Sequence, residues 1–462
     1  MANHNPNPLS VAAGTAACKL TRFALRVLGK GGTALPGKAA MVFCKDILAA
    51  TSRGMKVIIV TGTNGKTTTC RMLVHALEAN GYDVLNNSSG ANLLSGVTAE
   101  FTCGADWLGR PKKKYAVIEC DEGALKQVTP LIGPQVIAVT NLFRDQLDRY
   151  GEITHTLEAI RTGIERSPGS CIVLNADESL TASIADAVPN RAVFYGVNEP
   201  LEPGEGGEIS DARYCIHCGA PYRYHYRTYA HLGDFYCEKC GYKRRTPGIA
   251  VTKIRSMKST GSELEMSFGG ETCDVQVGLP ALYNVYNAVT AAAAYTALGL
   301  PRNEILSALS DVRSSFGRME TFTLGGKQLQ MILVKNPAGC NQAMSYVRGE
   351  DEDFAASFLL NDQTADGHDI SWIWDADYEM LAGCEHLKKI YVSGERAHDM
   401  ALRLKYAGFA EEQIELVENL DDLVKILREC KLPVFCLPNY TSMLALRARL
   451  RDEVGAADFW NT

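Results

Sequence analysis

The sequence of 462 residues contains no uninterrupted apolar run of 18 residues, so it lacks the signal of a membrane-spanning helix. Its first 56 residues also lack the apolar stretch of about seven to fifteen residues that a secretory signal peptide requires. No large excess of positive charge is present, and the net charge of −6 argues against a nucleic-acid-binding surface over the whole molecule. We therefore expect a cytoplasmic protein, whose 46% apolar residues are enough for the cores of two or three domains.

The amino-terminal segment departs from this charge balance. Residues 1–56 carry eight Lys or Arg and one acidic residue, Asp46, which gives a local charge of +7 (8 − 1). Apolar residues occur there at helical spacing: Leu20, Phe23, Ala24, Val27 and Leu28. The favoured interpretation is a helix that covers the first domain and leaves its basic face in solvent. The alternative is contact with an anionic membrane surface.

The 15 cysteines are of two kinds. Eleven occur singly in apolar or helical segments, which is typical of reduced core residues in a cytosolic protein. The other four form two C-x-x-C pairs, separated by 18 residues: Cys215, Cys218, Cys237 and Cys240. This spacing predicts a zinc ribbon whose closed shell of four sulfurs makes the zinc structural rather than catalytic. Two pairs rather than one disfavour redox chemistry. Three nearby histidines are spare candidates for metal ligands, but they are expected on the surface: His217, His225 and His231.

Residues 57–69 read V-I-I-V-T-G-T-N-G-K-T-T-T, an apolar strand that leads through a glycine-rich turn into a helix. This order predicts a loop that binds the phosphates of a nucleotide through Gly62, Thr63, Asn64, Gly65, Lys66, Thr67 and Thr68. Lys66 would supply a positive charge, and the Thr67 hydroxyl would ligate Mg²⁺. Val60 stands where the general P-loop pattern has a glycine, so the GTPase and kinase versions of the loop are excluded.

The remaining pattern defines the organisation of the chain. Strand-like and helical segments alternate from Met55 to about Ser310, and a second α/β stretch follows. This alternation predicts mostly parallel sheets with ligands at the carboxyl ends of their strands. We expect a basic helical segment over 1–54, a central P-loop ATPase domain over 55–312 with the zinc ribbon inserted at about 205–247, and a Rossmann-like α/β domain over 313–462.

The phosphate loop and four later motifs resemble those of the Mur ligases, a family that includes folylpolyglutamate synthase. Ala116–Glu122 resembles the acidic strand end at which Glu119 would bind Mg²⁺. Residues 140–148, T-N-L-F-R-D-Q-L-D, resemble the T-N-x-x-x-D-H-L-D motif with Gln146 in place of His, and they add Asn141 to the nucleotide site. Residues 279–288 resemble a helix start whose Asn284 and Asn287 would face the adenine, and 316–320 match a junction motif whose Arg318 would reach the phosphates.

Three departures narrow the resemblance. No lysine lies between Arg149 and Asn175, where many Mur ligases carry a carbamylated lysine. The segment Ile332–Pro337 replaces the family's D-Y-A-H-N-P, which suggests a changed acceptor. Because the phosphate loop follows so early in the sequence, we expect no amino-terminal UDP-binding domain. Together with the zinc ribbon and the D-G-x-D-x-S-W motif of Asp366–Trp372, these departures resemble the MurT-like synthetase subunits.

That resemblance implies ATP-dependent amidation of the α-carboxylate of D-glutamate in lipid II, at the inner membrane surface, through an acyl phosphate. It implies ATP, Mg²⁺ and Zn²⁺ as cofactors, with Lys66 and Glu119 as catalytic residues. The sequence has no G-x-C-x-G elbow and has Ala2 at position 2, so it offers no glutaminase nucleophile of its own. The resemblance therefore implies a heterodimer with a GatD-like glutamine amidotransferase, whose Cys-His pair Asp369, or Asp366 as second choice, would complete.

Two other functions fit parts of the sequence. One is a ligase that adds an amino acid, as folylpolyglutamate synthase does, although the ribbon and the missing D-Y-A-H argue against it. The other is an ATP-switched module whose basic, aromatic ribbon binds nucleic acid or protein through Tyr222, Arg223, Tyr224, Tyr226, Arg227, Tyr229, Lys239, Lys243, Arg244 and Arg245. The intact phosphate and magnesium ligands favour turnover over switching, and we expect no nucleic-acid partner.

Overall fold

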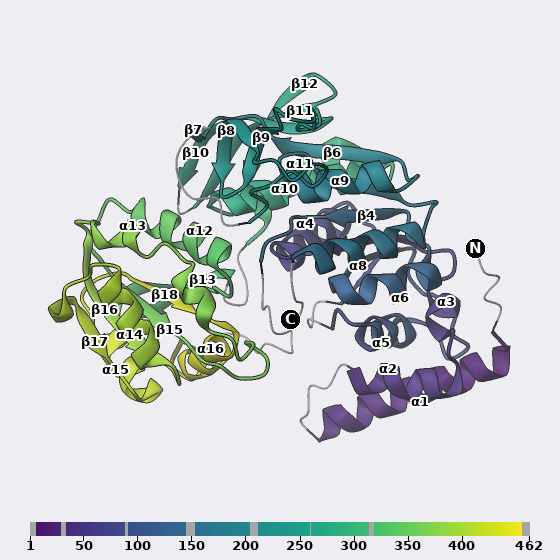
Figure 1. The fold of residues 1–462 in the computed structure, drawn as a ribbon. Coiled ribbons are helices and arrows are strands. Elements are labelled where there is room, and N and C mark those ends of the chain that lie inside the picture. Colours follow the sequence, from purple (N-terminus) through teal and green to yellow (C-terminus); the bar gives the residue numbers. More distant parts are fainter. Residues whose placement is uncertain are drawn as a thin grey trace. The chain divides into compact units, whose positions relative to one another are not determined.

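The computed structural model describes residues 6–28, 34–87, 91–144, 153–203, 211–258, 260–313 and 318–454. These residues form two compact units (Figure 1). Unit 1 comprises the described residues up to Phe143 and Ile153–Val312, and unit 2 comprises Arg144 and the described residues from Arg313 onward. Of the predicted motifs, Asp145, Gln146 and Asp148 lie outside the described residues, as does the side chain of Arg318.

A nine-stranded sheet forms the centre of unit 1, in the order β12-β11-β10-β6-β5-β4-β1-β3-β2. The seven strands from β10 to β2 run parallel, and β11 and β12 add an antiparallel hairpin at one edge. The bounds are β1 (Lys56–Thr61), β2 (Val84–Asn86), β3 (Tyr115–Glu119), β4 (Val136–Val139), β5 (Cys171–Asn175), β6 (Ala192–Val197), β10 (Ile249–Lys258), β11 (Gly261–Phe268) and β12 (Glu271–Val277). The predicted parallel α/β sheet is confirmed, whereas the hairpin is an addition.

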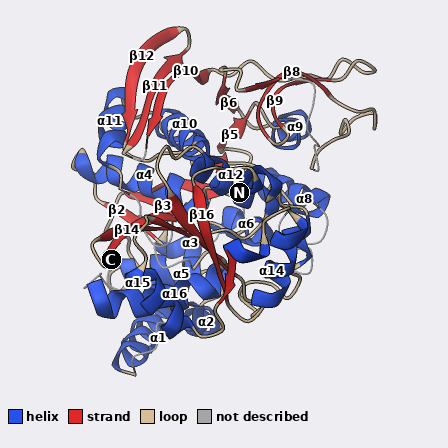
Figure 2. Ribbon diagram, turned by 90° about the vertical axis from the view of Figure 1, so that its left-hand side faces the viewer, coloured by secondary structure: helices blue, strands red, loops and turns tan. Residues whose placement is uncertain are grey.

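Helices cover both faces of this sheet (Figure 1 and Figure 2). On one face α4 and α10 pack against each other, with α11 beside them. The other face is covered by α5, α6, α8 and α9, whose apolar residues join Val57 and Ile59 in one buried cluster. The bounds are α4 (Lys66–Ala79), α5 (Leu94–Gly104), α6 (Glu122–Ile132), α8 (Ile153–Glu165), α9 (Ser179–Ala187), α10 (Leu282–Ala297) and α11 (Arg302–Ala308). Coverage of both faces explains why β1 is a continuous apolar run rather than an alternating one.

Three helices precede the sheet: α1 (Pro8–Val27), α2 (Ala34–Phe43) and α3 (Ile47–Thr51). All three pack against α5. Helix α1 turns its small residues inward. Gly14 lies so close to its neighbours that a Cβ there would be 2.7 Å from Cδ1 of Ile47 and 3.0 Å from the carbonyl oxygen of Ala40. Helix α1 thus packs on unit 1, as expected of a helix that covers the first domain, but its apolar residues Leu20, Phe23, Val27 and Leu28 face solvent.

The cysteine-rich insertion contains a small sheet of β8 (Arg223–Tyr229) and β9 (Leu232–Tyr236), with the short β7 (Glu202–Pro203) beside β8, and it packs against Ala182 of α9. Its attachment is an ion pair between Arg244 and Asp177, with 2.6 Å between Nη2 and Oδ1. The Asp177 carboxylate is fully buried and also accepts hydrogen bonds from the Tyr286 hydroxyl (2.6 Å) and the Val197 backbone N–H (2.7 Å). These partners satisfy the buried charge, so the ribbon is fixed to β6 and α10.

Unit 2 contains a six-stranded sheet in the order β13-β14-β18-β15-β16-β17, parallel except for β13. The strands are β13 (Arg318–Leu324), β14 (Lys327–Ile332), β15 (Phe354–Leu359), β16 (Leu387–Ser393), β17 (Ile414–Leu416) and β18 (Val434–Pro438). The helices are α12 (Pro337–Arg348), α13 (Glu379–Ala382), α14 (Ala397–Tyr406), α15 (Leu420–Glu429) and α16 (Tyr440–Val454). The predicted second α/β sheet is therefore confirmed.

Candidate nucleotide and metal sites

The phosphate loop lies where the carboxyl ends of three parallel strands meet. β1 pairs with β3 so that Val60 lies opposite Glu119, and with β4 so that Thr61 lies opposite Val139. The loop that follows β1 is therefore flanked by the residues that follow β3 and β4. The chain order reverses across β1 and β4, and such a switch point is the usual ligand site of a parallel sheet.

Two glycines shape the loop. Gly62 has φ 116° and Gly65 has φ 87°, both in the left-handed region that favours glycine. A Cβ at Gly62 would lie 2.4 Å from Oγ1 of Thr140, and a Cβ at Gly65 would lie 2.0 Å from Oδ1 of Asn287. Because of these close approaches, no larger side chain fits at either position while β4 and α10 keep their places.

Lys66 begins α4 and its charge is balanced inside the site. Its Nζ donates to Oε1 of Glu122 at 2.8 Å and to the carbonyl oxygens of Gly62 and, at 3.4 Å, Thr63. Glu122 is buried at the start of α6, so the pair is screened little by water. This arrangement keeps a cation at the amino end of α4, where the helix dipole also favours an anion.

Thr67 and Glu119, the two predicted magnesium ligands, are in contact. The Thr67 hydroxyl donates to Oε2 of Glu119, and the Asn92 side chain donates to Oε1 at 3.3 Å. Asn87 holds the Glu119 backbone at both its N–H (2.9 Å) and its carbonyl oxygen (2.8 Å). A hydroxyl and a carboxylate are oxygen donors of the kind that Mg²⁺ takes, so these residues could hold the ion.

Asn141 fixes the first half of the loop from β4. Its Oδ1 accepts from the Asn64 backbone N–H at 2.9 Å, and its Nδ2 donates to the Asn64 carbonyl oxygen at 3.2 Å. Its own carbonyl oxygen accepts from the Thr63 N–H at 2.8 Å. Asn141 is buried, so its role in the described site is to hold the loop backbone.

Asn284 and Asn287 lie in the first turns of α10 and are both buried. Asn287 Nδ2 donates to Oδ1 of Asn284 at 3.1 Å, while its Oδ1 accepts a longer bond from the Thr69 hydroxyl at 3.5 Å. Ala281, which precedes the helix, has φ 73°, a conformation that costs a non-glycine residue energy. The structure thus brings Asn287 against the phosphate loop, with Asn284 behind it.

Three contributors to this site were missed by sequence reasoning: Glu122 as the partner of Lys66, and Asn87 and Asn92 as supports of Glu119. Glu122 had a signal, because it belongs to the acidic run that ends β3. The two asparagines lie beyond the short strand β2, which no apolar pattern of useful length marks.

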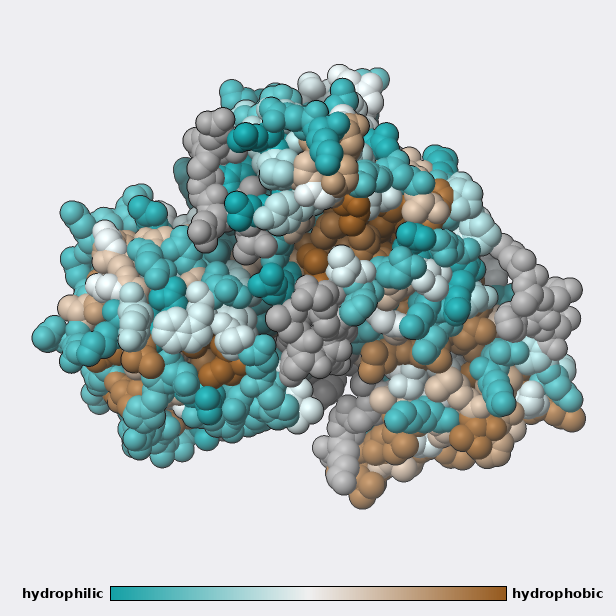
Figure 3. Space-filling model, viewed as in Figure 1, coloured by the Kyte–Doolittle hydropathy of each residue, from teal (hydrophilic) through white to brown (hydrophobic). Residues whose placement is uncertain are grey.

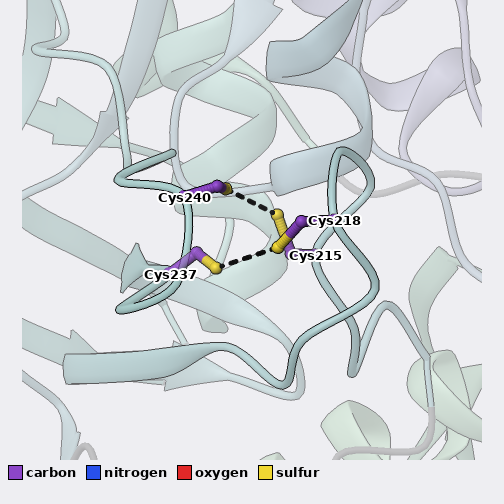
Figure 4. Close-up of side chains that lie close together, drawn as sticks. All are labelled: Cys215, Cys218, Cys237 and Cys240. Carbon is purple, nitrogen blue, oxygen red and sulfur yellow. Dashed lines mark hydrogen bonds between the residues drawn. The ribbon is translucent and has the colours of Figure 1, made fainter.

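The four predicted zinc ligands meet in one cluster (Figure 4). Their sulfurs all lie within 4.8 Å of one another, with 3.5 Å between Cys215 and Cys240 and 3.5 Å between Cys218 and Cys237. A disulfide would need a sulfur separation of about 2.05 Å. A tetrahedral zinc shell with Zn–S distances of about 2.3 Å has edges of roughly 3.8 Å, so the cluster could hold zinc.

The two C-x-x-C pairs share one backbone design. Each is followed by a glycine in the left-handed region, Gly219 (φ 71°) and Gly241 (φ 76°), whose N–H donates back to the first cysteine of its pair. The fold of each pair therefore points both thiols to one side. Among the three histidines, His217 and His225 are exposed as expected, whereas His231 is buried beside Glu178 and Phe143, which corrects the prediction of a surface residue.

The aromatic residues of the ribbon serve its own core. Tyr222 and Tyr224 are buried and join Phe235 and Ala182 in one cluster. Tyr229 is also buried, against Phe143 and Tyr286. Stacking on nucleic-acid bases needs exposed ring faces, so these three tyrosines are not available for it, whereas the basic residues Arg223, Lys239, Lys243 and Arg245 are exposed.

The D-G-x-D motif of unit 2 lies beyond the carboxyl end of β15. Asp366 is buried, and its Oδ1 accepts from the Thr441 N–H at 2.8 Å while its Oδ2 accepts from the Thr441 hydroxyl. Burial raises the pKa of Asp366. Asp369 is half-buried, and its Oδ1 accepts from the Ser371 N–H at 2.8 Å. Asp366 thus fixes the start of α16, and Asp369 is the more accessible carboxylate.

The junction motif contributes a further, largely buried ion pair. Glu320 is bound by Arg447 of α16, with 3.0 Å between Oε2 and Nε, and this pair ties β13 to the last helix. Met319, which lies between Arg318 and Glu320, has φ 63° and forms a bulge in the pairing of β13 with β14. The predicted phosphate contact of Arg318 stays a prediction, because its side chain is outside the described part.

Comparison with known proteins identifies the class of this chain. A family model of the Mur ligase middle domain matches residues 60–212, and a model of the MurT ligase C-terminal domain matches residues 333–443. Solved structures similar to it include a pseudomurein peptide ligase type C from Methanothermus fervidus (TM-score 0.65, 20% identity, 88% of this chain and 80% of the other). Folylpolyglutamate synthase from Mycobacterium tuberculosis, solved with ADP and AMPPCP, is also similar (0.60, 15%, 89% and 95%). The chain has the Mur ligase fold.

Two relatives match over almost the entire chain. The MurT subunit of lipid II isoglutaminyl synthase (glutamine-hydrolyzing) from Streptococcus pneumoniae is 35% identical over 445 residues, which cover 96% of this chain and 97% of the relative. The subunit of the same name from Staphylococcus aureus is 33% identical over 435 residues, 94% of this chain and 96% of the relative. The chain therefore belongs to the MurT family.

We predict that Gly65→Ala weakens ATP binding by at least about tenfold, because the new Cβ would collide with Asn287 and the backbone conformation would be strained. Gly81→Ala is the matched control, since Gly81 has a similar φ of 78° but open space around its Cβ. Isothermal titration with ATP and Mg²⁺ measures both. Equal affinities of the two variants would contradict the role of this close approach.

We also predict that the purified chain carries one zinc ion, and that Cys218→Ser loses it and unfolds at a lower temperature, because three sulfurs no longer close the shell. Cys384→Ser, at a half-buried single cysteine in unit 2, is the control and should keep the metal. Native mass spectrometry and thermal unfolding report the two effects. A zinc-free wild-type chain of unchanged stability after treatment with a chelator would rule out a structural metal.

Proposed function

We propose that the chain is the synthetase subunit of a lipid II isoglutaminyl synthase, which converts the D-glutamate of the lipid II stem peptide to D-isoglutamine. The proposal is supported by the likeness, over almost the full length of both chains, to subunits with that printed name. It is also supported by a phosphate loop in which Lys66, Thr67 and Glu119 converge. The helices of the described residues are all too short or too polar to cross a membrane.

In the proposed reaction, an oxygen of the α-carboxylate attacks the γ-phosphorus of ATP and ADP leaves. Ammonia then attacks the carbonyl carbon of the acyl phosphate, phosphate leaves, and the nitrogen loses a proton. A carboxylate is a poor electrophile until one oxygen becomes part of a leaving group. The protein's contribution is therefore to position the reactants and to offset negative charge.

The residues of the loop have distinct parts in this proposal. The backbone N–H groups of residues 65–68, at the amino end of α4, would bind the phosphate oxygens, since those of Thr63 and Asn64 are engaged by Asn141. Lys66 would exchange its bonds to Glu122 and to loop carbonyls for bonds to phosphate, and Glu122 would hold the ammonium group in place beforehand. Thr67 and Glu119 would hold Mg²⁺, whose charge offsets that of the phosphates. Asn284, Asn287 and Arg318 would complete the nucleotide site.

We further propose a heterodimer in which a GatD-like glutamine amidotransferase supplies the ammonia. The word subunit in the names of the relatives supports a complex of several chains. Asp369 is our choice for the carboxylate that orients the partner's catalytic histidine, because both oxygens of Asp366 are engaged by Thr441. The same proposal divides the chain into 1–54, a central ATPase domain over 55–312 and a carboxyl-terminal domain over 313–462.

The test incubates the full chain with ATP, Mg²⁺, lipid II and ammonium, and follows the stem peptide by mass spectrometry. We expect the D-glutamate residue to exchange a hydroxyl for an amino group. Lys66→Ala should slow this exchange roughly a hundredfold or more, because a charge that stabilises the transition state is lost. Lys388→Ala, at an exposed lysine, is the control. A peptide unchanged under all conditions, although ATP binds, would overturn the proposal.

Asp369→Asn should separate the two halves of the reaction. With the co-expressed glutaminase present, we expect glutamine-driven amidation to fall by up to about 10⁴-fold, as for an orienting carboxylate in a triad, while ammonium-driven amidation is unchanged. Asp377→Asn, at an exposed aspartate nearby in the sequence, should affect neither. Asp366→Asn should lower the stability of unit 2 instead. Equal use of glutamine by wild type and Asp369→Asn would refute the assignment.

A further inference from the structure

Helix α1 presents an apolar stripe to solvent. Leu20, Phe23 and Val27 recur at helical spacing and are 62%, 67% and 70% exposed, respectively. The buried face of the same helix consists of smaller residues, among them Gly14 and Cys18. Figure 3 shows hydrophobic residues gathered on the surface of α1 and α2. An apolar stripe on a surface helix normally faces the core, so this inverted arrangement marks a face that binds something else.

The stripe is bordered by cations. Lys19, Arg22 and Arg26 lie on the same helix, and these three together with Phe23 line one side of a hollow between α1 and α5. Lys19 Nζ also lies 5.0 Å from the centre of the Trp107 ring, which is exposed in the loop after α5. Trp107 therefore belongs to the same surface, which we call the α1 patch: Lys19, Leu20, Arg22, Phe23, Arg26, Val27 and Trp107.

The balance of charge on the α1 patch is positive. Arg22 is paired with Glu100 of α5 through both oxygens, at 2.9 and 3.2 Å, so its charge is largely offset. Lys19 donates to the carbonyl oxygen of Ala105 at 2.6 Å, which orients the ammonium group without neutralising it. Arg26 is exposed. The patch thus combines an apolar stripe, an aromatic ring and net positive charge in adjacent positions.

We propose that the α1 patch docks on the surface of a bilayer that contains anionic phospholipids. Leu20, Phe23 and Val27 would enter the boundary between headgroups and acyl chains, Trp107 would lie at headgroup level, and Lys19 and Arg26 would contact lipid phosphates. A second copy of this chain fits less well, because a two-fold interface would bring the same cations face to face. The inference deepens the proposed function, on which it rests only for the membrane location of the substrate.

The test uses the full chain and vesicle flotation, which needs no turnover. The chain should float with vesicles of phosphatidylcholine and phosphatidylglycerol, float less as salt is raised, and stay unbound with phosphatidylcholine alone. Phe23→Glu should reduce partitioning about tenfold or more, and Arg26→Glu should reduce it by roughly fivefold or more. Leu402→Glu is the matched control, at an exposed leucine of α14. Thermal unfolding of each variant verifies the fold.

Three results would overturn the proposal: no flotation of the wild type, equal flotation of wild type and both patch variants, or a concentration-dependent dimer that Phe23→Glu abolishes. Amidation of a water-soluble stem-peptide substrate with ammonium distinguishes this failure from failure of the proposed function. Phe23→Glu should leave that reaction unchanged. Vesicle binding by a chain that amidates neither substrate would overturn the proposed function but would support the membrane-binding role of the α1 patch.

Discussion

The parallel pairing of β1 with both β3 and β4 is the constraint on which the nucleotide site depends. A parallel pair aligns the carboxyl ends of its strands, so one loop and two strand ends reach the same place without any further folding step. A slip of β3 by one residue would turn Glu119 to the opposite face and separate it from Thr67. The site therefore needs both the apolar run of β1, which makes a buried central strand, and the two glycines after it, which allow the loop to fit between Thr140 and Asn287.

The electrostatic design of the site follows from the same geometry. Lys66 and Glu122 are both largely withdrawn from water, and each would carry a high desolvation cost alone. In the pair, Glu122 holds the Lys66 ammonium group in place, and a phosphate must compete with Glu122 to bind that group. Glu119 is restrained in a comparable way, by a hydroxyl on one oxygen and an amide on the other. The described residues thus form a polar network that is already ordered, which limits the reorganisation that binding requires.

Much of this could be predicted from the sequence, for reasons that differ between elements. The phosphate loop and the cysteine pairs are local patterns whose geometry is fixed within a few residues, and the structure brings each set together. Long-range features had weaker signals. The spacing of Leu20 and Phe23 correctly indicated a stripe on one side of a helix, but periodicity does not state which side faces the core. That choice was decided by Gly14, whose small size allows closer packing. The roles of Asp366 and His231 depended on Thr441 and Phe143, which are distant in the sequence.

The ion pair between Arg244 and Asp177 connects the zinc ribbon to α10, which contributes Asn287 to the nucleotide site. Asp177 also binds Tyr286, which precedes Asn287 in α10, and Asn287 lies against Gly65, the residue before α4. The ribbon is thus connected to the phosphate loop through a short series of buried contacts by way of Tyr286 and Asn287 of α10. Binding at two coupled sites is reciprocal, so a metal that stabilised the ribbon would favour the binding of nucleotide at the loop, and bound nucleotide would in turn favour retention of the metal.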